Sequence, residues 1–203
     1  EFADYMDKGC PLVLGGPLEQ CIAAKAVAFT EANTPEFKSY AATIVENARA
    51  LAQACVDEGM TVISGGTDNH LMLVDVTPFG ITGRQAASAL WECNVTLNKN
   101  AIPFDKHSAM ITSGLRIGTP AVTSLGMGTE EMREIASVIK QVLAGTKPGT
   151  IESGPKKGSL SKVKFRIEPE PAREASTRVK TLLERFPLYP GLDLQLLKRH
   201  FAG

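Results

Sequence analysis

One long amphipathic segment, from Thr34 to Gly59, constrains the fold of this chain more than any other feature. Thr34 followed by Pro35 is a pair that typically opens a helix, and Gly59 suits its carboxyl-terminal end. Between them, apolar side chains recur at helical spacing: Phe37, Tyr40, Ala41, Ile44, Val45, Ala48, Leu51, Ala52, Cys55 and Val56. The pattern predicts a helix with one apolar face, which needs a further layer of structure to cover it.

Shorter patterns predict the remaining elements. Turn-forming residues 1–18 indicate a loop, and alanine-rich residues 19–32 indicate a helix. We expect strands at 61–64, 70–76, 95–98 and 115–117, and helices at 82–93, 129–145 (with Thr129 as the N-cap) and 172–186. Residues 146–171 are rich in Pro, Gly and Lys and indicate a mobile loop. This order predicts a mixed or antiparallel sheet covered by helices on one side.

Composition narrows the possible partners. The 203 residues, of which 43% are hydrophobic, suffice for one sizeable core with appendages. The 22 basic and 22 acidic residues cancel and no apolar run is long enough to span a bilayer, so we expect neither nucleic acid nor a membrane as partner. Four cysteines without a C-x-x-C spacing favour a reducing cytoplasm, and three scattered histidines give no reason to expect a metal site.

Arg116 is the strongest candidate for a binding residue. It lies in the run 112–123, among glycines, small hydroxyl residues and β-branched apolar residues. Little in this setting hydrates or neutralises a guanidinium, whose planar fork fits a carboxylate with two hydrogen bonds. The partner could be a structural Asp or Glu, or the carboxylate of a ligand. The bare pattern favours the structural pair.

Several other blocks accompany this run. They are Gly15-Gly16-Pro17, Ser64-Gly65-Gly66-Thr67-Asp68-Asn69-His70-Leu71, Asn98-Lys99-Asn100 and the closing phrase Arg185-Phe186-Pro187-Leu188-Tyr189-Pro190. These blocks resemble serine hydroxymethyltransferase, a family of fold-type I enzymes that use pyridoxal phosphate (PLP). Their order and spacing match the family over roughly residues 10 to 145, and the closing phrase adds to the resemblance. Residues 150–177 match this family poorly and look like a lineage-specific insert.

The resemblance implies an α/β fold, the small carboxyl-terminal domain of such an enzyme. A remnant of the large PLP domain would occupy residues 1–35, the small domain 36–150, and the insert with a terminal helix and tail 151–203. The family's Schiff-base lysine lies in a threonine-rich His-Lys phrase upstream of the Gly-Gly-Pro loop, and the chain, which begins Glu1-Phe2-Ala3, has no such phrase. The resemblance therefore implies a fragment without a catalytic residue, inactive alone.

The resemblance also assigns binding roles. Arg116 would hold the carboxylate of the amino-acid substrate. The resemblance therefore favours a ligand as the partner of Arg116, although the sequence pattern alone favours a structural pair. Gly15 and Gly16 would bring backbone N–H groups to the PLP phosphate of a neighbouring subunit, which implies a homodimer or higher homo-oligomer.

A third group would contact the pteridine ring of tetrahydrofolate: Asn100, Ser108, Ala109 and Met110. The family usually has an aromatic residue where Met110 stands, and a histidine where residues 19–21 read Glu-Gln-Cys. Asp68, Asn69 and His70 are better explained by turn chemistry than by catalysis.

The reaction implied for the full-length enzyme belongs to one-carbon metabolism and amino-acid biosynthesis. Serine and tetrahydrofolate would be interconverted with glycine and 5,10-methylenetetrahydrofolate. Two alternatives stay open on the sequence: another fold-type I PLP enzyme, such as an aminotransferase or threonine aldolase, and a non-catalytic domain for amino-acid binding or protein interaction.

Overall fold

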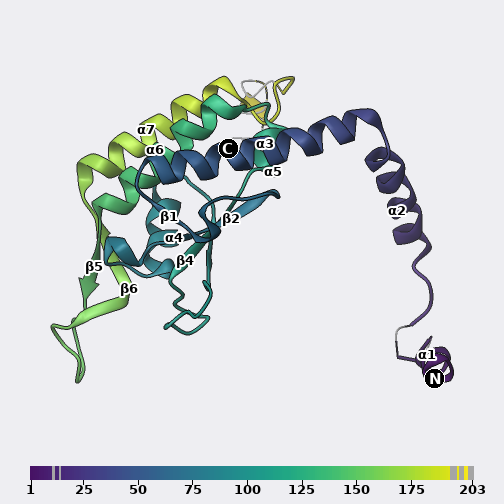
Figure 1. The fold of residues 1–203 in the computed structure, drawn as a ribbon, viewed down its shortest axis with the longest axis horizontal. Helices are drawn as coiled ribbons and strands as arrows, with labels where there is room; N and C mark the ends of the chain where they lie inside the picture. The colour runs from purple at the N-terminus through teal and green to yellow at the C-terminus, as the bar shows by residue number, and fades with distance from the viewer. Residues whose placement is uncertain (11, 14, 193–195, 197–198, 201–203) are drawn as a thin grey trace. The chain divides into compact units, whose positions relative to one another are not determined.

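The computed structural model describes residues 1–10, 12–13, 15–192, 196 and 199–200 (Figure 1). The chain forms two compact units, Glu1–Ala41 and Ala42–Gly203. Its helices are α1 (Ala3–Gly9), α2 (Glu19–Ala32), α3 (Pro35–Asp57), α4 (Gly83–Glu92), α5 (Pro120–Ser124), α6 (Thr129–Gly145) and α7 (Pro169–Arg185), with 3-10 turns η1 (Ile63–Gly65) and η2 (Thr77–Phe79). In this described part of the chain, no helix is both long and apolar enough to cross a membrane.

Two helices of the first unit have no buried residue. The prediction of a loop over residues 1–18 was wrong for Ala3–Gly9, which form α1, with Asp4 in its first turn and Lys8 in its last. Both charges stabilise the helix because they complement its dipole. The turn-forming residues nearby made this short helix hard to predict from the sequence. α2 is confirmed at its predicted position, and it leaves Ile22, Val27 and Phe29 exposed.

The structure confirms the helix predicted between Thr34 and Gly59, which is α3. Thr34 Oγ1 accepts a hydrogen bond from the backbone N–H of Phe37, as an N-cap should. Buried residues of α3 begin at Asn47, and Leu51 and Cys55 are among the most deeply buried. Only the second half of the amphipathic face is therefore covered within the described residues.

The main sheet is antiparallel, with strand order β1-β2-β4-β3. The strands are β1 (Thr61–Val62), β2 (Leu71–Asp75), β4 (Gly114–Gly118) and β3 (Asn98–Asn100). Alternate residues of β2 and β4 are buried and join α3, α4 and α6 in one core, which confirms a small sheet packed on helices. The strand predicted at 95–98 is displaced to 98–100, because residues 98–100 are the ones that find partners on β4.

Two details of the helices differ from the prediction. Thr129 is the first residue inside α6 and not its cap. The N-cap is Gly128, whose backbone N–H donates to the Glu131 carboxylate at 2.9 Å. The short helix α5, opened by Pro120, was not predicted. Five residues are too few to show helical periodicity in a sequence.

The prediction of a mobile loop over residues 146–171 was wrong. An antiparallel hairpin of β5 (Thr146–Thr150) and β6 (Leu160–Ile167) occupies most of this segment, and α7 follows it. The hairpin is held by α4. The side chain of Gln85, 1% exposed, donates to the carbonyl oxygens of Ser161 and Lys164, both at 2.7 Å. These contacts cross more than 70 residues of sequence, so composition alone gave no sign of them.

Candidate functional site

Arg116 lies on the open face of the main sheet. Along β4, Leu115 and Ile117 are buried in the core, whereas Arg116 and Gly118 are exposed on the other face. Leu73 of β2 and Asn98 of β3 stand opposite Arg116 in register. Because side chains alternate along a strand, Arg116 and Gly118 lie on the same face of the sheet. Gly118 has no side chain, so it leaves space beside the guanidinium.

The guanidinium of Arg116 makes no hydrogen bond or ion pair with any residue that the structure describes. The structural Asp or Glu favoured by the bare sequence pattern is therefore not found in this part of the chain. An unpaired guanidinium on an open face is available for an external carboxylate.

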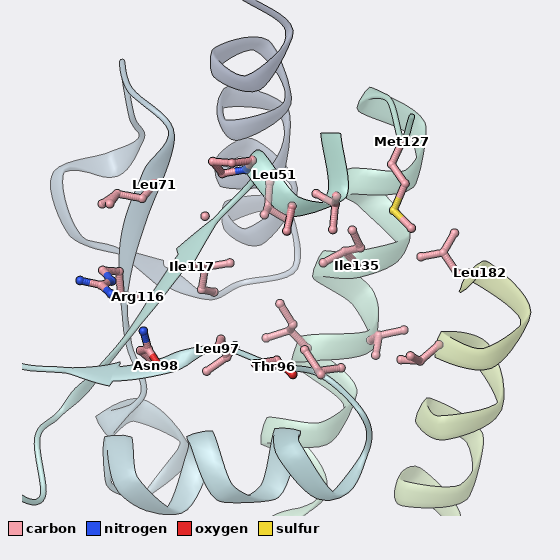
Figure 2. A pocket seen from close by; sticks show the side chains of 18 of the residues that line it. Leu51, Leu71, Thr96, Leu97, Asn98, Arg116, Ile117, Met127, Ile135 and Leu182 are labelled. Atoms are coloured by element: carbon pink, nitrogen blue, oxygen red, sulfur yellow. The ribbon is translucent and has the colours of Figure 1, made fainter. Parts of the chain in front are cut away.

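A cavity of about 630 Å³ adjoins this position (Figure 2). α6, α7 and the residue Met127 before α6 contribute apolar side chains to its wall, among them Met127, Ile135 and Leu182, and residues 94–98, 116–118 and 120–122 contribute much of the rest. Arg116 lies at the margin, with its guanidinium pointing away from those three side chains. Polar residues also line the cavity, among them His70, Asn94 and Thr96. The guanidinium of Arg116 is the group at its margin that suits a carboxylate.

The predicted folate residues lie on β3 and in the loop 101–113. Asn100 pairs with Gly114, two positions along the strand from the Asn98–Arg116 pair, so it shares the face of Arg116. Ser108, Ala109 and Met110 are exposed in the loop, Met110 with 66% of its surface accessible. Lys99 Nζ donates to the Ala109 carbonyl oxygen at 2.9 Å and ties this loop back to β3.

Asp105 is a residue of this loop that the sequence analysis missed. Its carboxylate accepts hydrogen bonds from the backbone N–H groups of Ile102, His107 and Ser113 and from Ser113 Oγ. Burial opposes the charged form, but these four bonds together outweigh it and lower the pKa of Asp105 to about 2. The spacing Asp-x-His could have indicated a local turn. Nothing in it indicated the bonds to Ser113, eight residues further on.

Gly15 and Gly16 belong to the first unit and are exposed. Gly15 has a φ of +76°, and no atom lies within 4 Å of a Cβ built on either glycine. Neither amide nitrogen has a hydrogen-bond partner among the described residues. Free, adjacent backbone N–H groups on bare glycines are compatible with an anion such as a phosphate.

The turn before β2 agrees with a structural interpretation. Asn69 Oδ1 accepts a hydrogen bond from the backbone N–H of Leu71 at 2.9 Å, and Thr67 Oγ1 donates to the Leu71 carbonyl oxygen at 2.6 Å. Asn69 and Thr67 therefore shape the turn itself, as Asx and Thr side chains commonly do.

Comparison with known proteins identifies the family. The family model described as serine hydroxymethyltransferase matches residues 1–139. The serine hydroxymethyltransferase of Treponema pallidum is 56% identical over 202 residues, which are 100% of this chain and 34% of that protein. That of Salinispora tropica is 49% identical over 194 residues, 96% of this chain and 40% of the relative. That of Chlamydia trachomatis serovar D is 46% identical over 197 residues, which are 97% of this chain and 39% of that protein.

The chain thus spans between a third and two fifths of the length of these curated relatives, and it matches their carboxyl-terminal portion. The Treponema protein aligns over the whole chain, so residues 150–177 have a counterpart there. The family model covers more than half of the sequence, and a relative more than half identical covers all of it. This chain belongs to the serine hydroxymethyltransferase family.

Proposed function

We propose that the full-length protein carrying this chain is a PLP-dependent enzyme that interconverts serine plus tetrahydrofolate with glycine plus 5,10-methylenetetrahydrofolate. The observation that carries the proposal is the guanidinium of Arg116, which has no partner among the described residues and lies on the open sheet face together with Asn100. Bound PLP supplies the electron sink that makes a bond at the substrate α-carbon labile. The residues of this chain bind and orient the substrates around it.

Arg116 holds the amino-acid carboxylate in this proposal. Two parallel N–H···O bonds fix both the position and the rotation of a carboxylate, which a single charge does not. Fixing the carboxylate decides which bond of the α-carbon is aligned for cleavage. Such positioning removes a large part of a barrier, because the reacting groups need no further ordering.

The loop of Gly15 and Gly16 contributes to the phosphate site of a neighbouring subunit. Its amide groups, which have no hydrogen-bond partner in the described part of the chain, and the space around both glycines support this role. Since the loop would serve a second chain, the enzyme is a homodimer or a higher homo-oligomer.

Asn100 and the exposed segment Ser108, Ala109 and Met110 contact the pteridine ring of tetrahydrofolate. An asparagine amide offers a donor and an acceptor to the edge of a pterin. The flexible thioether of Met110 packs against the ring in this proposal. The position of Asn100 on the same face as Arg116 supports a shared site for both substrates.

The chain by itself is inactive in this proposal, because no lysine occupies a Schiff-base phrase. Lys25 lies on the exposed helix α2, and Lys99 is engaged with the Ala109 carbonyl oxygen. Residues 1–35 correspond to the large domain, 36–150 to the small domain and 151–203 to the terminal region. All four cysteines are free thiols, which supports a location in the cytoplasm.

Arg116→Lys in the full-length enzyme tests the carboxylate role. An ammonium group cannot reproduce the two-pronged grip, so we expect serine turnover to fall by about 100-fold or more while PLP remains bound. Arg133→Lys is the matched control, since Arg133 is an exposed arginine of α6. Steady-state kinetics and the absorbance of bound PLP give the two measurements. Near-normal turnover of Arg116→Lys would show that Arg116 does not bind the substrate.

A further inference from the structure

We propose that Asp105 is a positioning residue that fixes the loop 101–113 in the shape that receives tetrahydrofolate. The inference rests on the proposed function, since it concerns the folate side of the same site. Asp105 itself does not touch the substrate in this proposal. It acts through the exposed residues Ser108, Ala109 and Met110.

The loop is long for a connection between two paired strands. β3 ends at Asn100 and β4 begins at Gly114, and these two residues pair directly. Thirteen residues therefore leave the sheet and return to the same place, where two to five would suffice for a hairpin. A loop of this length without helix or strand needs its own internal contacts to hold one conformation.

Asp105 supplies those contacts from one side chain. Oδ2 accepts from the backbone N–H of Ile102 at 3.2 Å and of Ser113 at 2.8 Å, so it joins the start of the loop to its end. Oδ1 accepts from the backbone N–H of His107 at 2.8 Å and from Ser113 Oγ at 2.7 Å. A carboxylate that accepts several N–H groups forms strong, charge-assisted bonds.

The backbone on both sides of these bonds is strained. Four non-glycine residues in the described part of the chain have positive φ, and two of them, Phe104 (58°) and Thr112 (61°), lie in this loop. Phe104 precedes Asp105, and Thr112 precedes Ser113. A left-handed conformation is especially unfavourable for a β-branched residue such as Thr112. Such conformations persist only where neighbouring contacts impose them, and they cluster at ligand sites.

The bonds leave the predicted folate segment uncovered. The carbonyl oxygens of Ile111 and Thr112 accept from Arg84 and Gly83 at the start of α4, which anchors the loop at one end. Asp105 ties Ile102 and His107 to Ser113, and Ser108, Ala109 and Met110 remain exposed between His107 and Ile111. The arrangement holds the segment without occupying its outer surface, as a preorganised binding loop requires.

Asp105 is unsuited to act as a catalytic base. Each carboxylate oxygen already accepts two hydrogen bonds. The lowered pKa also makes the carboxylate a weak base near neutral pH. Positioning is the role that remains for a saturated carboxylate in this loop.

The test uses the full-length enzyme with Asp105→Ala and Asp105→Asn. Tetrahydrofolate binding in the presence of glycine is measured by equilibrium titration, and glycine and PLP binding are measured separately. Asp105→Ala should weaken tetrahydrofolate binding about tenfold or more, because bonds to a charged acceptor are lost. Asp105→Asn should weaken it less, since one amide oxygen still accepts. Glycine and PLP affinities should be unchanged in both variants.

Lys106→Ala is the control, because Lys106 is exposed and directly follows Asp105. Hydrogen exchange without folate adds a second measurement: the amides of His107 and Ser113 should exchange faster in Asp105→Ala. If Asp105→Ala does not fold, Ser113→Ala removes one of the four bonds and should raise the KM for tetrahydrofolate but not for serine.

Two outcomes would overturn the inference. If both Asp105 variants bind tetrahydrofolate as tightly as the unmodified enzyme, Asp105 does not position the folate loop, and the proposed function is unaffected. An unmodified enzyme that binds PLP and glycine but no tetrahydrofolate would refute the proposed function itself, and the inference with it.

Discussion

At the scale of single residues, Gly114 is the position of the sheet with the least room for a side chain. A Cβ at Gly114 would lie 2.5 Å from Ile102 Cγ2 and 3.1 Å from the carbonyl oxygens of Asn100 and Val74. The two carbonyls belong to backbone that is held in or beside the sheet and cannot yield easily. The absence of a side chain at Gly114 is thus a condition for the β3–β4 pairing that carries Asn100.

Gly114→Ala should therefore lower the free energy of unfolding by about 1–3 kcal/mol, the usual cost of overpacking. Gly66→Ala is the matched control, since no atom lies within 4 Å of its Cβ and its φ of 172° is ordinary extended backbone. The control should change stability by less than about 0.5 kcal/mol. Urea denaturation followed by circular dichroism measures both. Equal stability of the two variants would contradict the crowding at Gly114.

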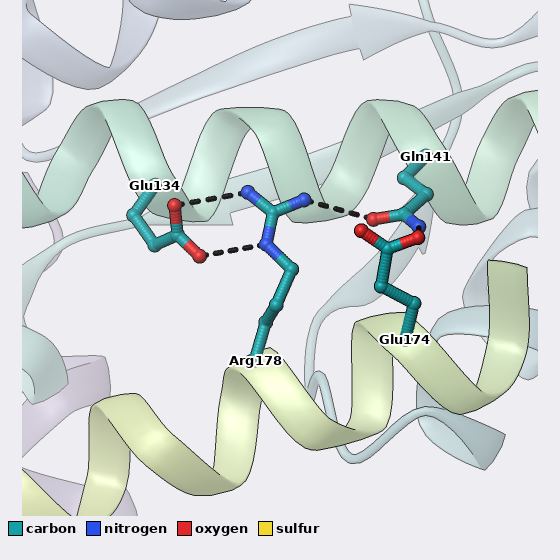
Figure 3. Close-up of polar contacts among 4 residues, drawn as sticks. All are labelled: Glu134, Gln141, Glu174 and Arg178. Carbon is teal, nitrogen blue, oxygen red and sulfur yellow. Dashed lines mark hydrogen bonds and ion pairs between the residues drawn. The ribbon is translucent and has the colours of Figure 1, made fainter.

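At the scale of elements, Arg178 makes the most extensive polar contact between α6 and α7 (Figure 3). Arg178 on α7 donates from Nε and Nη2 to the two carboxylate oxygens of Glu134 on α6, at 2.7 and 2.9 Å. Its Nη1 donates to Gln141 Oε1 at 2.8 Å. Hydrogen bonds from Arg178 lower the pKa of Glu134 despite partial burial. A single guanidinium thus bridges two turns of α6.

Arg178→Lys should destabilise the chain by about 1 kcal/mol, because a lysine cannot form the fork. The pKa of Glu134 is lowered in the folded chain. The ionised carboxylate therefore stabilises the fold fully at a pH above the pKa of an unfolded Glu, near 4.3, and this stabilisation is lost as the pH falls through the pKa of the folded state. The difference between Arg178→Lys and the unmodified chain should therefore shrink in acid. Lys180→Ala, which removes an exposed pair of 3.9 Å, is the control and should have little effect. A difference that persisted at low pH would count against the ion pair.

At the scale of the whole molecule, helix α2 of the first unit exposes several apolar side chains. α2 has no buried residue, and Ile22, Val27 and Phe29 each expose more than half of their surface. Exposed apolar side chains on one helix are typical of a surface that another part of a protein covers. The relatives are longer than this chain by more than half of their own length, which leaves ample polypeptide for that role.

We therefore expect the full-length enzyme to be at least a homodimer and the chain alone to dimerise poorly. The proposed phosphate loop of Gly15 and Gly16 serves a neighbouring subunit, so a complete site needs two copies. Light scattering on both proteins gives the measurement. A full-length enzyme that is monomeric and fully active would refute the shared site.

The sequence by itself determined the elements that depend on neighbours close along the chain. The periodicity of residues 34–59 and 129–145 predicted α3 and α6, because one face of a helix repeats every three to four residues. Short runs of strand-forming residues beside turn residues likewise predicted β2 and β4, and the order of motifs predicted the family. Arg116 was singled out because its surroundings in sequence could not neutralise it.

Only the tertiary structure decided what depends on residues far apart in the chain. It left Arg116 without a partner in the described residues, whereas the sequence pattern favoured a structural pair. It ordered the hairpin of residues 146–167 through Gln85, and it joined the ends of the loop 101–113 through Asp105. Hydrogen bonds between remote segments form only when folding brings their donors and acceptors together. The composition of residues 146–171, rich in Gly, Pro and Lys, reflects only that segment. It gives no information on a hydrogen bond to a residue 80 positions away, such as that of Thr82 to the Lys162 carbonyl oxygen.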